Sequence, residues 1–210
     1  MAATGEPTAG CDGATGREAA ADRVAGTSVL VIADHPNTEK ISRHYGPLAD
    51  VAGETTMVCL NGAADVEGIT FREAPTFGHR LLAIPLVFFV GLAEMLGGDY
   101  DAIVSISLVP YGTFALVLGR LTGTPVHLGI IGADLDRHAE AWYGPLPKAL
   151  FRQFDAVSVP GTNHGDRLAA AGVPRDRITV LTNTVDAETY GPPPARGQRD
   201  VDLLWIGRFS

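Results

Sequence analysis

Polar side chains follow apolar, strand-length runs at five places in this sequence of 210 residues, and they are the groups that could carry chemistry. The first run is followed by Asp34, His35 and Asn37, with Arg43 and His44 a little further along. Later polar groups are Ser107 with residues 110–112, and residues 132–137, 160–164 and 183–186. Ligands of an open parallel sheet bind at the carboxyl ends of its strands. Polar side chains gathered at that edge therefore indicate a ligand-binding cleft.

Each of these residues also has a structural interpretation. Asp34 and Asp136 are of a type favoured at helix N-caps, and Thr162 or Asn163 could cap a helix that begins at Gly165. Glycines after strands often serve only as turn residues. For single residues, the binding and the structural interpretations both stay open.

Several motifs of cofactor and metal enzymes are missing from the sequence. No G-x-G-x-x-G motif follows the first apolar run, which argues against a nicotinamide or flavin enzyme. The sequence also lacks a P-loop, an H-E-x-x-H motif and paired cysteines, and its six histidines are scattered. We therefore expect no cofactor and no metal site.

Composition restricts the partners and the compartment. The formal net charge is -8 and the isoelectric point is near 5.1, which argues against nucleic acid as a partner. The first 26 residues lack the apolar core of a secretory signal, and two cysteines make no disulfide framework. A cytoplasmic location is expected, with membrane association as a further possibility.

Strand-length and helix-length segments alternate along most of the chain. This alternation predicts a doubly wound, mostly parallel, Rossmann-like α/β sheet. Strands are expected at 28–33, 55–60, 69–73, 102–106, 126–131, 156–159 and 178–181. Helices are expected at 38–52, 78–96, 113–121, 137–154 and 165–171, the last of them stopped by Gly172.

The ends of the chain predict a domain division. We expect a flexible tail at 1–26, a Rossmann-like domain at 27–186 and an interdomain linker at 187–200, which contains three consecutive prolines. Residues 201–206 then resemble a new buried strand. Since one strand cannot form a domain, residues 201–210 are expected to open a second domain that is cut short.

The most apolar stretch of the sequence lies at residues 81–96. It is shorter than the roughly 20 residues of a membrane-spanning helix, and it contains Pro85 and Glu94. A buried core helix is one interpretation, and a helix that touches a membrane surface is the other.

Four stretches of the second half resemble the amino-terminal domain of family four retaining glycosyltransferases, which have two facing Rossmann-like domains (the GT-B architecture). Residues 99–105 (DYDAIVS) are similar to one strand of that family. The remaining similarities are Pro125 with 132–134 (GAD), the ordered set from Asp155 through 171–173 (AGV) to 183–186 (NTVD), and 203–209 (LLWIGRF). The first half of the chain matches only in architecture.

This resemblance implies transfer of a sugar from a nucleotide-diphosphate donor to an acceptor, with retention of the anomeric configuration. It implies that this chain is the acceptor half, inactive alone, and that Gly207 and Arg208 belong to the donor site. Arg208 would pair with the donor diphosphate. Asp134 is the expected catalytic residue. Acceptor-binding residues would be His35, Asn37, Arg43 and Ser107.

The implied acceptor is a sugar, a lipid-linked molecule or another small molecule, and residues 78–96 are the expected site of any peripheral membrane contact. The sequence departs from the family pattern at three places. The loop after the first strand lacks a Gly-Gly pair, Ile131 stands where many members have histidine, and Thr184 replaces a glycine. Two alternative functions stay open: a non-catalytic partner-binding or regulatory module, and an enzyme similar to nucleotide-sugar 2-epimerases.

Overall fold

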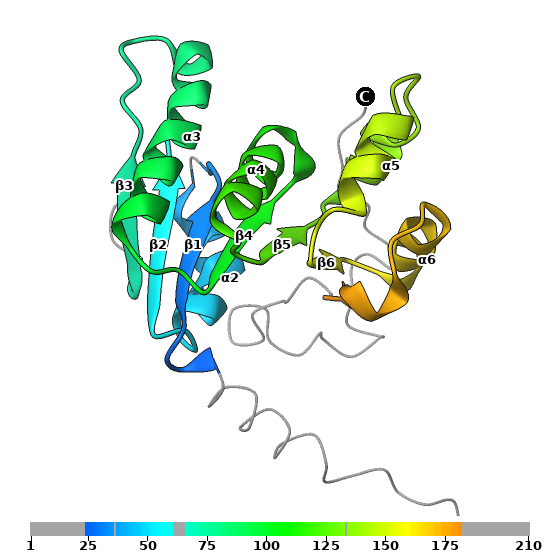
Figure 1. Ribbon diagram of the computed structural model, residues 1–210, viewed down its shortest axis with the longest axis horizontal. Coiled ribbons are helices and arrows are strands. Elements are labelled where there is room, and N and C mark those ends of the chain that lie inside the picture. Colours follow the sequence, from blue (N-terminus) through cyan, green and yellow to red (C-terminus); the bar gives the residue numbers. More distant parts are fainter. Residues whose placement is uncertain (1–23, 36, 61–65, 133, 182–210) are drawn as a thin grey trace, which may run out of the picture.

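The computed structural model describes residues 24–35, 37–60, 66–132 and 134–181. They form one seven-stranded sheet with the strand order β3-β2-β1-β4-β5-β6-β7 (Figure 1). All six neighbouring pairs are parallel. The predicted doubly wound Rossmann-like fold is therefore confirmed. The predicted linker and second-domain strand, together with Gly207, Arg208 and most of the tail, lie outside the described residues.

The strands form where the sequence has short runs of β-branched and apolar residues. In β1, four of five residues are buried, as expected for a central strand covered on both faces. The strands are β1 (Ser28–Ile32), β2 (Glu54–Cys59), β3 (Ile69–Glu73), β4 (Ala102–Ile106), β5 (Val126–Gly129), β6 (Ala156–Val159) and β7 (Ile178–Val180).

β5 ends two residues before the predicted boundary. The backbone N–H of Ile131 donates to the Asp134 carboxylate at 3.2 Å, and the Ile131 carbonyl accepts from the Asp134 N–H at 2.9 Å. These bonds turn the chain back on itself, so Ile131 leaves the sheet.

Helices cover the two faces of the sheet in different numbers. On one face, Ile41 and Tyr45 of α2 pack against Val29, Val31 and Met57. On the other face, α3 and α4 pack against Leu30, Ile32 and Leu128 in the larger core. The helices are α2 (Thr38–Ala49), α3 (Arg80–Gly97), α4 (Thr113–Thr122), α5 (Pro145–Phe151) and α6 (Thr162–Ala170).

α3 contains the apolar stretch, and only one side of this helix enters the core. Ala83, Val87 and Met95 are buried, whereas Leu81 is 81% exposed and Phe89 is 59% exposed. The expectation of a buried core helix is therefore right for one face of α3 and wrong for the other. Among the described residues, no helix is long and apolar enough to cross a membrane.

The helix predicted at 137–154 is wrong over most of its length. The structure has a π-helical turn at Asp134–His138 and then turns, and α5 begins only at Pro145. Two prolines explain the late start, because proline is tolerated in the first turn of a helix and disrupts its interior. Gly144 sits where an added Cβ would overlap the Ala139 carbonyl oxygen, so the chain folds back tightly before α5.

Capping also differs from the sequence interpretation. Asn37, not Asp34, caps α2, since its Oδ1 accepts from the Glu39 N–H at 2.8 Å. The N-cap of α6 is the extended residue Gly161, so Thr162 lies within the first turn. Gly172 follows α6 with φ +92°, as predicted for a residue that ends a helix.

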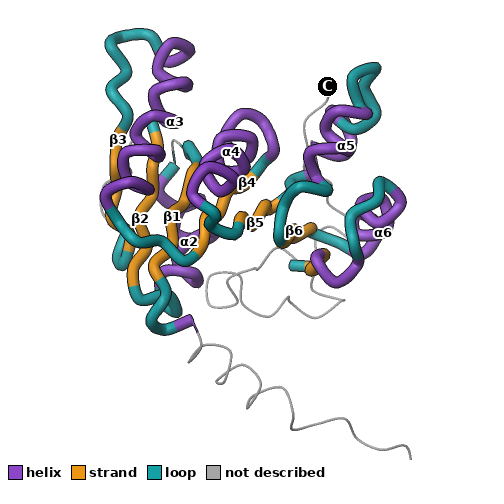
Figure 2. The backbone as a smooth tube through the Cα atoms, viewed as in Figure 1, coloured by secondary structure: helices purple, strands orange, loops and turns teal. Residues whose placement is uncertain are grey.

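Two connections extend beyond the carboxyl edge of the sheet. One joins β3 to α3 and the other precedes α5 (Figure 2). They stand on either side of the central strands, and they flank the edge at which the polar side chains gather.

His127 in β5 links stability to pH. Burial lowers the pKa of His127, so the folded chain keeps it neutral where the unfolded chain begins to bind a proton, near pH 6.5. Stability is therefore expected to fall as the pH drops below about 6.5. Urea midpoints measured from pH 7 to pH 5 should fall more steeply for the native chain than for His127→Gln. His35 and His44 are present in both proteins, so equal slopes would contradict this role of His127.

Candidate functional site

The direction of chain winding reverses between β1 and β4. From β1 the chain moves through α2 to β2, and from β4 it moves through α4 to β5 on the other side. The loops after β1 and β4 therefore separate and leave a crevice, which is the usual ligand site of this architecture. His35 follows β1, Ser107 follows β4 and Asp134 follows β5. The structure thus brings these predicted residues to one edge.

Asp134 joins two of the loops at this edge. Its side chain is 1% exposed. One carboxylate oxygen accepts from the Ser107 hydroxyl and from the Leu108 N–H, both at 3.0 Å, and the other accepts from the Ile131 N–H at 3.2 Å. Asp134 therefore fixes the loop after β4 to the loop after β5. A catalytic role for Asp134 stays a prediction, and this geometry gives it a positioning role.

Ser107 has a strained backbone. Its φ of +72° and ψ of 137° lie outside the regions that residues with a side chain prefer, which typically costs about 1–3 kcal/mol. The conformation is held by the bond to Asp134, by the Ser107 N–H to the Gly129 carbonyl at 2.8 Å, and by the Gly112 N–H to the Ser107 carbonyl at 3.1 Å. Stored strain of this kind is typical of functional sites.

The N-cap and the first two turns of α2 (residues 37–45), called the head of α2 below, carry the other predicted acceptor residues. Asn37 is exposed, and its side-chain oxygen accepts the capping hydrogen bond of α2. Asn37 therefore has the structural role of a helix cap, and its role in binding an acceptor is a separate prediction. Arg43 is exposed on the second turn of α2. The acceptor roles of Asn37 and Arg43 stay predictions.

Two imidazoles lie close together at the same place. The His35 ring centroid is 6.1 Å from those of His44 and Tyr45. Burial lowers the pKa of His35, the charges of His44 and Lys40 lower it further, and Asp34 opposes them. Burial followed by the charges of Arg43 and Lys40 lowers the pKa of His44. Both histidines are therefore mainly neutral at pH 7 and can donate or accept a hydrogen bond.

The structure adds an ionic connection that sequence reasoning missed. Arg167 in α6 pairs with Asp136 and with Glu140, and it donates to the Leu135 carbonyl at 3.0 Å. This group ties the segment after β5 to α6. Arg167 lies 27 to 32 positions from these partners in the chain, so no local motif signals the connection.

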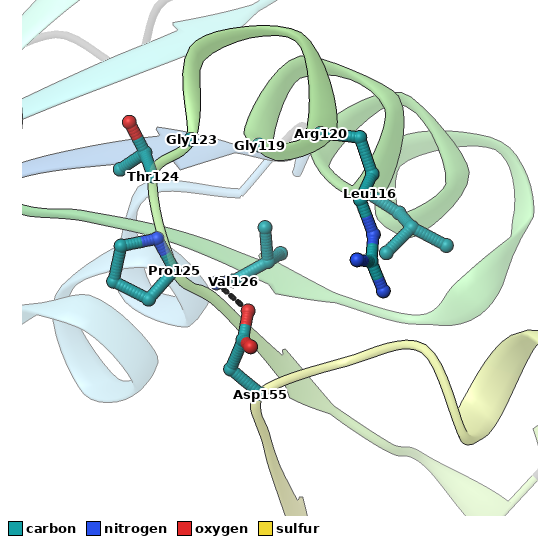
Figure 3. Close-up of a pocket in the computed structure, with 8 residues that line it drawn as sticks. All are labelled: Leu116, Gly119, Arg120, Gly123, Thr124, Pro125, Val126 and Asp155. Atoms are coloured by element: carbon teal, nitrogen blue, oxygen red, sulfur yellow. Dashed lines mark hydrogen bonds between the residues drawn. The ribbon is translucent and has the colours of Figure 1, made fainter.

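A cavity of about 250 Å³ lies elsewhere, at the amino end of β5 (Figure 3). Gly119, Arg120, Thr124 and Asp155 are among its lining residues, and the Asp155 carboxylate accepts from the Val126 N–H at 2.9 Å. Parallel sheets of this kind bind ligands at the opposite edge. We therefore assign this cavity no part in the site. Among the described residues, no group of three or more acidic, histidine or cysteine side chains is arranged to hold a metal ion.

Comparison with known proteins gives a family. The sequence profile described as "Glycosyl transferase 4-like domain" matches residues 13–184. No curated protein sequence matches the chain.

Solved structures share the fold. HepE from Anabaena in complex with UDP-glucose has a TM-score of 0.58 and 16% identity, over 80% of this chain and 47% of that one. HepE in complex with UDP and glucose has a TM-score of 0.56 and 14% identity, again over 80% of this chain and 47% of that one. The UDP-GlcNAc 2-epimerase of Methanocaldococcus jannaschii has a TM-score of 0.49 and 14% identity, over 74% of this chain and 45% of that one. The chain spans about half the length of these structures.

Proposed function

Because this chain belongs to the family of glycosyl transferase 4-like domains, we propose that it is the acceptor-binding half of a glycosyltransferase. The reaction is transfer of a sugar from a nucleotide-diphosphate donor with retention of configuration. The observation that carries the proposal is the match of the family profile to residues 13–184 of the 210-residue chain. Polar loops at the β1–β4 crevice supply the site.

The proposed division of labour follows from the chemistry of transfer. A retaining transferase must stabilise an oxocarbenium-like sugar and a departing diphosphate, so fixed dipoles and cations matter more than a strong base. His35, Asn37, Arg43 and Ser107 are proposed to line the acceptor side. Asp134 fixes the loop that presents Ser107.

The donor is proposed to bind the second domain, which residues 201–210 open and to which Gly207 and Arg208 belong. A guanidinium such as that of Arg208 suits bidentate contact with a diphosphate. The names of the similar structures, which include UDP and UDP-glucose, support a nucleotide-sugar donor. This half alone is expected to be inactive, because one domain cannot close a two-domain cleft.

An assay of the complete natural protein tests the function. Nucleoside diphosphate release is measured with a panel of nucleotide sugars and of neutral, phosphorylated and lipid-linked acceptors. We expect acceptor-dependent release, and a product whose anomeric NMR coupling matches the donor. Inversion would contradict retention alone. Isomerisation of the sugar without transfer would indicate an epimerase, and absence of any reaction across the panel would favour a non-catalytic module.

Peripheral membrane contact is proposed through the outer face of α3, and the two adjacent phenylalanines offer a matched test. Phe89 is 59% exposed, whereas Phe88 packs on the core with its ring 5.8 Å from that of Phe114. Phe89→Ser is expected to weaken vesicle co-sedimentation with little loss of stability. Phe88→Ser is expected to lower the urea midpoint, because it places a polar group against the core. Unchanged vesicle binding by a folded Phe89→Ser variant would contradict membrane contact.

A further inference from the structure

The head of α2 gathers basic side chains around the crevice. Lys40, Arg43 and His44 are exposed and occupy positions i, i+3 and i+4, so they share one face of the helix. The His44 ring lies 6.1 Å from that of His35, which adds a second imidazole able to donate a hydrogen bond. The chain as a whole has a net charge of -8 and only two lysines, one of which is here.

Among the described residues, the two permanent cations of this group form no ion pair with a carboxylate. In the part of the chain that the structure describes, Arg72, Arg167 and Arg175 each pair with a carboxylate, whereas neither Lys40 nor Arg43 does. Two carboxylates, Asp34 and Glu39, lie in the same segment. Asp34 partly opposes the influence of Lys40 and His44 on the pKa of His35.

Two buried polar atoms lie close to this group, one on His35 and one on Tyr45, and the ring centroids of these residues are 6.1 Å apart. Among the described residues, neither Nε2 of His35 nor the hydroxyl of Tyr45 has a hydrogen-bond partner. Tyr45 is 1% exposed, and its ring approaches His35, so this side chain leans toward the head of the helix. Buried polar atoms in native proteins are normally satisfied, and a missing partner often marks a ligand or a bound water.

The backbone adds to the same preference. α2 has 12 residues, and its N-terminus carries partial positive charge directed at the crevice. Unpaired cations, a helix N-terminus and unsatisfied hydrogen-bonding atoms together suit a phosphate or a carboxylate, which accepts several hydrogen bonds at once.

We infer that the acceptor carries an anionic group, a phosphate or a carboxylate, which binds at the head of α2 between Lys40, Arg43 and His44. This inference rests on the proposed function, because a sugar acceptor exists only if the protein is a glycosyltransferase. The side chains of α2 would thus determine the chemical class of the acceptor. The donor diphosphate would bind the other half of the protein.

The two lysines make a direct test possible, since Lys148 in α5 serves as an internal control. The full chain is treated with a limiting amine-acetylating reagent, and mass spectrometry reports modification of Lys40 relative to Lys148. The probes are inorganic phosphate, glucose 6-phosphate, glucuronate, glucose and uridine diphosphate. We expect phosphate, glucose 6-phosphate and glucuronate to protect Lys40, glucose to leave it unprotected, and Lys148 to change with none of them.

Variants sharpen the result. Arg43→Gln is expected to raise the concentration of glucose 6-phosphate needed for half-protection of Lys40 by about tenfold, because a charge-assisted hydrogen bond is lost. Arg175→Gln, at an exposed arginine paired with Asp166, should leave it unchanged. The inference is overturned if no anion protects Lys40 above Lys148, or if only uridine diphosphate does. Protection of Lys40 is measured without turnover. Protection can therefore be absent while sugar transfer is observed, and transfer can be absent while protection is observed.

Discussion

Replacing Asp134 with alanine is expected to lower the free energy of unfolding by about 3–5 kcal/mol. The substitution removes the acceptor of three hydrogen bonds, from the Ser107 hydroxyl and from the Leu108 and Ile131 backbone N–H groups. Two of the donors are backbone groups that cannot be deleted, and an unsatisfied buried donor costs about 1–3 kcal/mol. The strained conformation of Ser107 also loses a bond that holds it. Urea unfolding followed by circular dichroism measures the loss.

A conservative variant separates position from charge. Asp134→Asn keeps one oxygen for Ser107 and Leu108 and turns an NH₂ group toward the Ile131 N–H, so a smaller loss of about 1–3 kcal/mol is expected. If Asp134→Ala unfolds at the same urea concentration as the native chain, the carboxylate does not hold the two loops. In the complete protein, a folded Asp134→Asn variant with native kcat would exclude a catalytic role for the charge.

Replacing Gly119 with alanine is expected to destabilise the fold by about 3 kcal/mol or more. Gly119 lies in α4 on the side that faces Val126 of β5 (Figure 3). An added Cβ would overlap Cγ2 of Val126 and lie 2.6 Å from the Thr124 carbonyl oxygen. Neither atom can yield easily, because one belongs to a β-branched side chain of the core and the other to the backbone. The higher helix propensity of alanine offsets only about 1 kcal/mol of this cost.

Gly97 provides the matched control for Gly119. It is the last residue of α3, it is exposed, and an added Cβ would meet no atom within 4 Å. Gly97→Ala is expected to leave stability unchanged or slightly higher. Thermal unfolding midpoints of the two variants should therefore differ by many degrees. Equal midpoints would show that α4 does not approach β5 as closely as the structure has it.

The strands could be predicted from the sequence because each is a short apolar run bounded by turn residues. β3, β4 and β6 have the predicted bounds, and other strand boundaries differ by one or two residues. Parallel strands buried on both faces give a strong local signal. The gathering of Ser107 and Asp134 at one edge followed directly from strand direction.

The remaining features depend on contacts between distant segments. Nothing near Asp136 in the sequence indicates that Arg167 will pair with it. The helix expected at 137–154 runs across Gly144 and Pro145, but the tight approach of Gly144 to Ala139 decides where the helix begins. The preference of asparagine and aspartate for the same cap position concealed the choice of Asn37 over Asp34 at α2. The candidate site was thus predictable as a location, and its hydrogen bonds were not.

The location of the acceptor at the β1–β4 crevice is the central claim, and the imidazole NMR signals of the six histidines test it most directly. The full chain is titrated with the acceptor from which the complete protein forms product. We expect the signals of His35 and His44 to move with a common dissociation constant, while those of His79 and His138 stay in place. Signals of His35 and His44 that stay in place, while that of His127 beside Val126 of the amino-edge cavity shifts, would contradict the account.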